Sequence, residues 1–253
     1  MSDKMGFNAV YPFATENVGG YFKKLNLEGK DILTVGSSMD QLLNSVVFGA
    51  DKVTVLDINP YCEEYFQMKK KKIFECKREQ FFDNIMNMNN GDFFSKDVLF
   101  REKVYFVNEY LKNDNMYELL REKINKLDIQ FVTGDVFKMN ELGLDKTYDC
   151  MILSNVLQSM EYVYKDKREL FLQLRNSFSI WDSYLKDGGI LQLLYLYSYG
   201  IEDLYCLRHG IATYCLRDVY QALCSYSLDI FWIEGIVDGK NDAVVTYTKR
   251  LKK

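Results

Sequence analysis

A short turn and an acidic residue are spaced along this chain as they are in many nucleoside-binding proteins. Gly36, Ser37 and Ser38 follow a short apolar run, and Asp57 ends the next such run, 21 residues after Gly36 (57 minus 36). A turn of small residues that leads into a helix lets backbone N–H groups approach a polar or anionic ligand. An acid at the end of the second strand can accept both hydroxyls of a ribose. The spacing therefore predicts a cofactor that contains a nucleoside.

The glycine content of the turn distinguishes two kinds of cofactor. A dinucleotide site needs the pattern G-x-G-x-x-G, because the later glycines let the backbone reach a pyrophosphate and let the helix pack on the strand. In this turn only Gly36 is a glycine. The hydroxyls of Ser37 and Ser38 suit an amino-acid head group better than a diphosphate. We therefore predict S-adenosylmethionine (SAM) rather than NAD as the cofactor.

The third strand-like run predicts the adenine side of the site. The apolar segment 129–133 ends at Gly134 and Asp135. In a SAM-binding sheet the acid at this point can accept a hydrogen bond from the adenine amino group, with Val136 or Phe137 against the ring. A Gly-Asp pair is also common in ordinary turns, and that alternative stays open.

A fourth run supplies candidates for the acceptor side. The segment 148–155 delivers Ser154 and Asn155 to its carboxyl end, and ligands of open parallel sheets bind beyond such ends. Displacement at a sulfonium needs alignment more than acid or base catalysis. The single histidine of the chain is either a general base or a structural residue. The residues predicted to face the transferred group are Asn155, Tyr197, Tyr199 and His209.

Hydrophobic periodicity predicts alternating strands and helices. Strands are predicted at 32–35, 53–56, 129–133, 148–155 and 190–197, followed by a closing hairpin of 228–237 and 243–248. Helices are predicted at 18–25, at 42–47 closed by Gly49, from Pro60 with Asn59 as N-cap, at 169–185 stopped by Gly188-Gly189, and at 216–223. These elements sum to an α/β three-layer sandwich, the Rossmann-like seven-stranded class I methyltransferase fold, in which the hairpin places one strand antiparallel.

The connection between the second and third predicted strands is unusually long. It runs 72 residues from Asp57 to Ile129 (129 minus 57), whereas a simple crossover needs about a dozen or two. We predict a helical insertion at about 76–126. It either covers the active site and selects the acceptor or forms a dimerisation surface.

Composition favours one soluble domain over residues 1–253. The chain has 253 residues, 48% of them apolar, which is enough for one substantial core. A formal net charge of −4 gives no electrostatic reason to expect nucleic acid as a partner. No run reaches the roughly 18 apolar residues of a spanning helix, and the N-terminus MSDKMGFNAVYPF lacks the pattern of a secretory signal. We expect a cytoplasmic protein without a transmembrane segment, and homo-oligomerisation stays open.

Neither the cysteines nor a run of four lysines predicts a special site. The six cysteines lack CxxC spacing, so we expect reduced core thiols and no metal site. Lys69 to Lys72 are predicted to form a solvated face near a helix end, where they complement the helix dipole. Contact with an anionic substrate or a membrane surface is the alternative.

Four segments, ENVGGYF, LTVGSSMDQLLNSVVFGA, VTVLDINPYCEEYFQMKKKKI and YDCMILSNVL, resemble a family of SAM-binding proteins. The family is related to the betaine-lipid enzyme diacylglycerol aminocarboxypropyltransferase, and the resemblance covers Glu16 to Phe82 and Ile129 to Leu157. Its turn usually reads G-S-S-G-D-Q, whereas Met39 stands here in place of the second glycine. The resemblance implies a SAM cofactor.

These observations together predict a SAM-dependent transferase that acts on a small-molecule or lipid-like acceptor. Methyl transfer and aminocarboxypropyl transfer both remain open, and so does a non-catalytic SAM-binding sensor or assembly partner. The predicted cofactor-binding residues are Asn17, Gly36, Ser37, Ser38, Asp40, Gln41, Asp57, Ile58, Asn59, Gly134, Asp135, Val136, Ser154 and Asn155.

Overall fold

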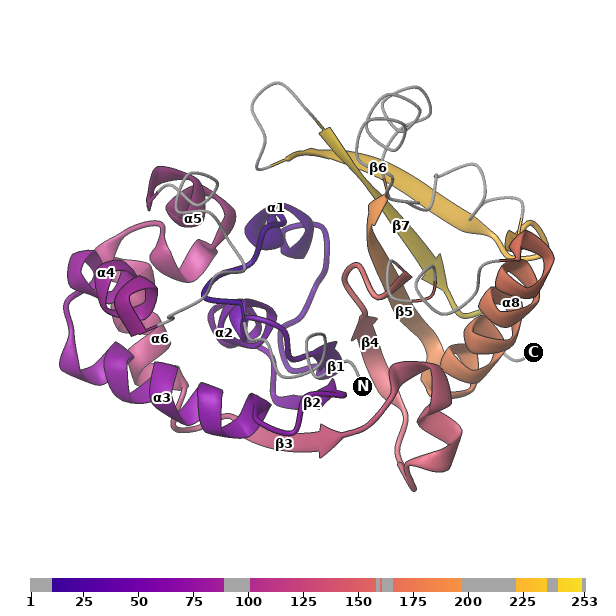
Figure 1. The fold of residues 1–253 in the computed structure, drawn as a ribbon, viewed down its shortest axis with the longest axis horizontal. Helices are drawn as coiled ribbons and strands as arrows, with labels where there is room; N and C mark the ends of the chain where they lie inside the picture. The colour runs from indigo at the N-terminus through magenta and orange to yellow at the C-terminus, as the bar shows by residue number, and fades with distance from the viewer. Residues whose placement is uncertain are drawn as a thin grey trace, which may run out of the picture. The chain divides into compact units, whose positions relative to one another are not determined.

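Seven strands form one mixed sheet in the order β3-β2-β1-β4-β5-β7-β6 (Figure 1). The computed structural model describes residues 11–88, 101–157, 160, 166–196, 222–235 and 241–251. The strands are β1 Asp31–Val35, β2 Lys52–Asp57, β3 Asp128–Thr133, β4 Tyr148–Ile152, β5 Leu185–Leu196, β6 Leu228–Glu234 and β7 Asn241–Thr248. The chain divides into two compact units, Met1–Val136 and Phe137–Lys253, which are described one at a time. A single domain over residues 1–253 stays a prediction.

The first unit contains three parallel strands. Strand β1 pairs with β2 in the register Ile32 to Val53, and β2 pairs with β3 in the register Val55 to Phe131. The residues of β1 from Ile32 to its end are buried, as expected of a central parallel strand. The helices are α1 Val18–Phe22, α2 Asp40–Val47, α3 Cys62–Glu75, α4 Arg78–Met88, α5 Arg101–Val107 and α6 Asp114–Lys123, with a short 3-10 segment at Glu109–Leu111. A second 3-10 segment, Val136–Glu141, begins at the last residue of this unit.

Helix α2 follows the turn after β1, as predicted. All of its residues are buried, the polar ones included, so it is a core helix rather than an amphipathic surface helix. Gly49 lies just beyond its end with a φ of 85°, the left-handed conformation expected there.

The described part of the insertion is helical. Helices α4, α5 and α6 lie together in Figure 1, and aromatic rings join them: the Phe82 ring centroid lies 6.5 Å from that of Tyr105 in α5, and the Phe81 centroid lies 5.9 Å from that of Tyr117 in α6. Asn113 caps α6 by accepting a hydrogen bond from the Met116 N–H at 3.0 Å. Phe13 of the N-terminal segment stacks on Phe82 with the ring centroids 5.4 Å apart, so the insertion shares this aromatic cluster with the segment before α1.

The second unit contains the predicted terminal hairpin. Strand β5 runs parallel to β4, and β7 runs antiparallel to both β5 and β6. Helix α8, Lys167–Ser183, begins after Asp166, whose side chain accepts from two N–H groups of the first turn. It buries Trp181 and Phe178, and the Trp181 ring centroid lies 5.7 Å from that of Phe137.

Two sequence predictions need correction in the second unit. Gly188-Gly189 was expected to separate helix from strand, but β5 already begins at Leu185 and contains both glycines. Gly188 has a φ of 78°, and a Cβ on Gly189 would lie 2.8 Å from the Lys186 carbonyl oxygen, so the pair forms an irregularity inside the strand. Cys224, expected in the core, is exposed because it lies in the turn before β6.

Within the described ranges, every helix is too short or too polar to cross a lipid bilayer. Nor do three or more metal-ligating side chains gather at any point of those ranges.

Candidate functional site

Gly36 lies in a space that excludes a side chain. A Cβ at this position would lie 2.7 Å from the Cys62 sulfur and 2.9 Å from Oδ2 of Asp57. The turn after β1 therefore packs directly against the end of β2 and the start of α3. Close backbone approach, rather than an unusual φ angle, is the reason for glycine here.

The turn uses several of its own N–H groups internally. The Ser37 N–H donates to Oδ2 of Asp57 at 2.9 Å, the Met39 N–H to the Gly36 carbonyl at 2.7 Å, and the Asp40 N–H to the Ser38 hydroxyl oxygen at 3.3 Å. The expectation that the N–H groups of this turn face a ligand is therefore wrong for these three. They instead hold the turn in one shape.

Two residues of the turn have left-handed backbone conformations. Ser37 has a φ of 42° and Met39 a φ of 68°. Residues with a Cβ are unfavourable in this region and persist where surrounding contacts over-determine the backbone. Met39 is also fully buried. The residue that replaces the second glycine of the family pattern thus adopts the conformation that glycine favours.

Asp57 is held by backbone groups and keeps capacity for a ligand. It is half-buried; Oδ2 accepts from the Ser37 N–H, and Oδ1 accepts from the Asn59 N–H at 2.9 Å. A carboxylate has about four acceptor positions, so about two are left beside the two N–H groups, and the neighbouring Cys62 thiol donates toward one of them when no ribose is bound. Burial, and then the nearby Asp57 charge, raises the pKa of the Cys62 thiol, which keeps that thiol neutral.

Asn59 does not cap helix α3 as predicted. Helix α3 begins at Cys62, so Asn59 and Pro60 do not open it. The Asn59 side chain instead accepts from the Tyr61 N–H at 2.9 Å and forms a turn before the helix. Ile58 remains 42% exposed beside it, which is open enough for an aromatic ring to pack on.

The end of β3 lies beside the end of β2. Asp57 pairs with Thr133 across the two strands, and the Gly134 N–H donates to the Asp57 carbonyl at 2.8 Å. Asp135 is half-buried and Val136 is buried at this end of the sheet. The structure thus brings the predicted ribose and adenine residues of the first unit to adjacent strand ends.

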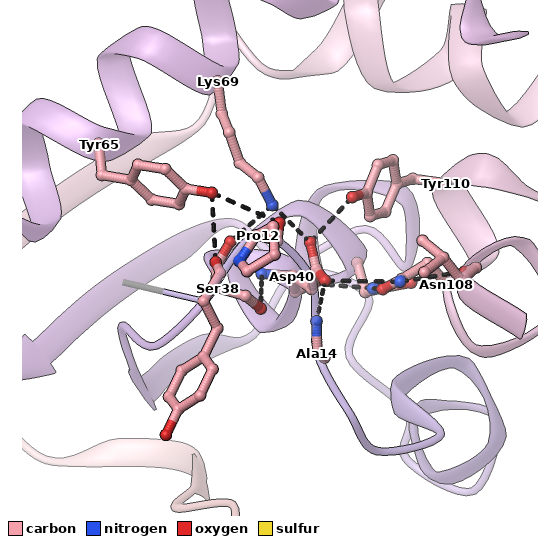
Figure 2. A network of polar contacts seen from close by, with 11 residues as sticks. Pro12, Ala14, Ser38, Asp40, Tyr65, Lys69, Asn108 and Tyr110 are labelled. Atoms are coloured by element: carbon pink, nitrogen blue, oxygen red, sulfur yellow. Dashed lines mark hydrogen bonds and ion pairs between the residues drawn. The ribbon is translucent and has the colours of Figure 1, made fainter. Parts of the chain in front are cut away.

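Asp40, a predicted cofactor residue, lies in a buried polar network (Figure 2). Its Oδ1 accepts from the Lys69 ammonium at 2.9 Å and from the Tyr110 hydroxyl at 2.8 Å, and its Oδ2 accepts from the Ala14 N–H at 2.5 Å. The Asn108 amide is a longer donor to Oδ2, at 3.5 Å. The Asp40 carboxylate therefore makes its contacts with the protein.

The prediction that Lys69 to Lys72 form a solvated face is wrong for Lys69. Its side chain is 0% exposed, whereas its neighbour Lys71 is 71% exposed. Burial lowers the pKa of Lys69, and the Asp40 carboxylate opposes that shift. The ammonium also donates to the Ser38 carbonyl at 2.7 Å and lies 4.6 Å from the centroid of the Phe13 ring.

The segment before α1 is fixed against the same region. Asn17 caps α1 by accepting from the Gly20 N–H at 2.8 Å. The Gln41 amide nitrogen donates to the Glu16 carboxylate, which also accepts from the Tyr21 hydroxyl at 3.4 Å. The other polar atom of Gln41, Oε1, is buried without a hydrogen-bond partner among the described residues. Such an atom at a predicted cofactor turn fits a ligand that carries a donor.

In the second unit, Ser154 and Asn155 follow the end of β4. Ser154 is buried with a φ of 51°, and its hydroxyl donates to the Asn155 side-chain oxygen at 3.4 Å. The catalytic candidates Tyr197, Tyr199 and His209 lie outside the described residues.

Sequence reasoning missed the residues that bury Asp40. Asn108 and Tyr110 lie 68 and 70 residues further along the chain, so no local pattern joins them to it. Lys69 had a signal: Cys62, Phe66, Lys69 and Ile73 are the buried residues of α3 and follow helical spacing, which places this lysine on the apolar face.

Comparison with known proteins agrees with the fold. No protein-family model and no curated protein sequence matches the chain. The N-methyltransferase NodS from Bradyrhizobium japonicum, solved with S-adenosyl-L-homocysteine (SAH), is 13% identical with a TM-score of 0.51, and the match covers 90% of this chain and 84% of that one. Magnesium protoporphyrin IX methyltransferase from Synechocystis, solved with bound SAH, is 13% identical with a TM-score of 0.50 over 92% of this chain and 80% of that one.

These likenesses and the strand order agree with the predicted fold. The chain has the class I methyltransferase Rossmann-like α/β fold, with β7 antiparallel in its seven-stranded sheet. At this level of identity the likeness concerns the fold alone.

Proposed function

We propose that this protein is a SAM-dependent transferase that binds its cofactor at the turn after β1 and at the acid that ends β2. The observation that carries the proposal is the difference in burial and hydrogen bonding between the two acids beside this turn, Asp57 and Asp40. Asp57 is half-buried, held by two backbone N–H groups and left with acceptor capacity, which suits a ribose. Asp40 occupies the first turn of α2 and is fully buried.

The same observation argues against a dinucleotide. A pyrophosphate site presents backbone N–H groups and a helix N-terminus to the phosphates. Here the N–H groups of Ser37, Met39 and Asp40 already have acceptors within the turn and at Asp57. The first turn of α2 holds the carboxylate of Asp40, paired with Lys69, so this helix end has little room for a phosphate.

The residues of the first unit fit the parts of SAM. Asp57 would accept the ribose hydroxyls, and Asp135 with Ile58 and Val136 would hold the adenine. Gln41 and Ser37 lie at the turn where the amino-acid end is expected, and the unpartnered Oε1 of Gln41 would accept from its ammonium.

When bound, SAM supplies a sulfonium whose methyl or aminocarboxypropyl carbon is open to displacement by a nucleophile. The chain's part is to bind and orient. The two 2.9 Å hydrogen bonds from the Ser37 and Asn59 N–H groups fix the Asp57 carboxylate, and the internally bonded turn fixes the backbone beside it. A rigid frame of this kind lowers the entropy cost of aligning nucleophile, carbon and sulfur.

Methyl transfer and aminocarboxypropyl transfer remain alternatives within the proposal. The solved structures named above are methyltransferases, which favours the first. The motif resemblance to the diacylglycerol aminocarboxypropyltransferase family favours the second. A small-molecule or lipid-like acceptor is proposed on the same resemblance.

The insertion is proposed to cover and select the acceptor. It leaves the sheet after Asp57 and returns at β3, so its ends flank the proposed ribose and adenine residues. A role as a dimerisation surface is the alternative. The test is a variant in which a short linker replaces the insertion. If that variant is a monomer where the wild type is a dimer, and transfer activity is intact, the insertion is a dimer interface.

Calorimetry with SAH and with NAD tests the cofactor. We expect SAH or SAM to bind and NAD not to bind, and NAD binding tighter than SAM would refute the proposal. Incubation with SAM and a panel of acceptors then separates the reactions: SAH as product means methyl transfer, and methylthioadenosine means aminocarboxypropyl transfer. Tight SAM binding without turnover across the panel would favour a sensor or assembly partner.

A further inference from the structure

The Lys69 ammonium makes two of its contacts with the turn that the cofactor is proposed to bind. It donates to the Ser38 carbonyl oxygen at 2.7 Å and to Oδ1 of Asp40 at 2.9 Å. An ammonium has three N–H donors, so two of the three serve residues only two positions apart in this turn. Figure 2 shows the lysine reaching from α3 toward Asp40 and Ser38.

The turn has a conformation that needs such support. Ser37 and Met39 both lie in the left-handed φ region, which costs free energy for residues that carry a Cβ. The Ser37 end is tied to Asp57 by the Ser37 N–H. The Ser38 to Asp40 end is tied to α3 by Lys69. The hydrogen bond to Asp57 holds Ser37, and the two hydrogen bonds from Lys69 hold the residues before and after Met39. Together these contacts fix both strained residues.

Lys69 is itself closed off from any ligand. Its side chain is 0% exposed and lies over the Phe13 ring. Ala14 of the N-terminal segment and Asn108 and Tyr110 of the insertion donate to the same Asp40 carboxylate and enclose the lysine. Any effect on a bound cofactor must therefore pass through the turn.

We propose that Lys69 is a positioning residue of the cofactor site: through the Ser38 carbonyl and the Asp40 carboxylate it sets the shape of the turn Gly36–Asp40 and thereby the place of the Asp57 carboxylate. This inference rests on the proposed function. It assigns to the first residue of a four-lysine run a role that its three neighbours do not share.

The test separates positioning from stability by means of two variants. Lys69→Met removes the charge and leaves the buried Asp40 carboxylate without its cation, so its melting temperature should fall. Asp40→Asn combined with Lys69→Met is neutral and nearly isosteric, so much of the melting temperature should return. In both variants the Ser38 carbonyl lacks its donor.

We expect SAH, measured by isothermal titration calorimetry, to bind both variants at least tenfold more weakly than the wild type. The control Lys72→Met changes a partly exposed lysine of the same run that pairs with Glu75, and it should bind SAH as the wild type does. A double variant with recovered melting temperature and wild-type SAH affinity would show that the pair serves stability alone, and it would overturn the inference. If the wild type binds SAH and Lys72→Met weakens binding as much as Lys69→Met, the inference also fails. A wild type that binds no SAH would overturn the proposed function, and this inference with it.

Discussion

Asp40 and Asp57 flank the same turn of the first unit but have opposite surroundings. The Asp40 carboxylate is fully buried and accepts from a lysine, a tyrosine, an asparagine and a backbone N–H. The Asp57 carboxylate is half-buried and accepts from two backbone N–H groups. Asp40 joins the N-terminal segment, α3 and the insertion to α2. Asp57 is held in place by the protein but keeps acceptor positions for a ligand. An acid beside a cofactor turn is therefore not by itself a ligand-binding acid.

The largest expected effect is on stability, from Asp40→Ala. Removing one partner of a buried ion pair leaves an uncompensated charge on Lys69 and typically costs about 3–5 kcal/mol. Urea denaturation followed by far-UV circular dichroism measures the free energy of unfolding. The matched control is Glu75→Ala, which breaks an exposed pair with Lys72 and should leave that free energy unchanged. Equal stability of the two variants would mean that the buried pair of Asp40 and Lys69 contributes no more to stability than an exposed pair, contrary to the contrast drawn above.

The second effect is on binding, from Asp57→Ala. We expect SAH affinity to fall by about 100-fold or more, since two hydrogen bonds to a charged group are lost and each is worth about 1.5–3 kcal/mol. Asp135→Ala should weaken binding less, because one hydrogen bond to adenine is lost rather than two to ribose. Isothermal titration calorimetry on folded variants measures both. If Asp57→Ala binds SAH as tightly as the wild type does, this acid only stabilises the turn and does not contact the cofactor.

A smaller effect is expected from Tyr110→Phe in the insertion. The variant removes the 2.8 Å hydrogen bond to Asp40 but keeps the ring, so the free energy of unfolding should fall by about 1–2 kcal/mol. Tyr105→Phe is the control, because its hydroxyl donates to a neutral carbonyl, that of Arg78, in a part-buried place. If Tyr110→Phe proves no more destabilising than Tyr105→Phe, the insertion is not tied to α2 through Asp40.

The smallest effect concerns a third acid, in the second unit. Burial raises the pKa of Asp242 to about 6, and its Oδ2 accepts no hydrogen bond from the described residues. Since this pKa is above the unfolded value, the ionised carboxylate costs stability above pH 6, and protonation relieves that cost as the pH falls toward 4.

Asp242→Asn should therefore be more stable than the wild type at pH 8, by about 1 kcal/mol, because the cost of ionising the buried carboxylate, about 1.4 kcal/mol per pKa unit, is partly replaced by the cost of burying the amide. The gain should vanish near pH 4. Thermal unfolding at both pH values measures the difference, and a gain that does not depend on pH would point to a cause other than ionisation.

Local sequence patterns were sufficient for the existence and order of the strands, although the pair Gly188-Gly189 wrongly suggested that β5 begins only at residue 190. The parallel strands read as short apolar runs, and the spacing from Gly36 to Asp57 follows from one strand, one turn and one helix. The hairpin of β6 and β7 was predictable for the same reason, because its two strands are close in sequence. The fold could therefore be predicted from periodicity and turn residues.

Long-range polar contacts were not predictable in this way. Asp40 meets Asn108 and Tyr110, which lie 68 and 70 residues further along the chain, and hydrogen bonds of this kind leave no periodic signal in a single sequence. The role of Lys69 was hidden among identical neighbours, although its helical spacing with Phe66 and Ile73 placed it on the buried face. The internal bonding of the Ser37 and Met39 N–H groups depended on dihedral angles that residue types alone do not fix.

The burial of Trp181 between Phe137 and Phe178 has a spectroscopic consequence. The chain has two tryptophans, Trp181 and Trp232, and both belong to the second unit. Emission excited at long wavelength, where tyrosine hardly absorbs, therefore reports on the second unit, while the tyrosines around Asp40 are silent. A fluorescence transition that differs from the circular dichroism transition in the Asp40 variant would reveal that the two units unfold as separate cooperative blocks.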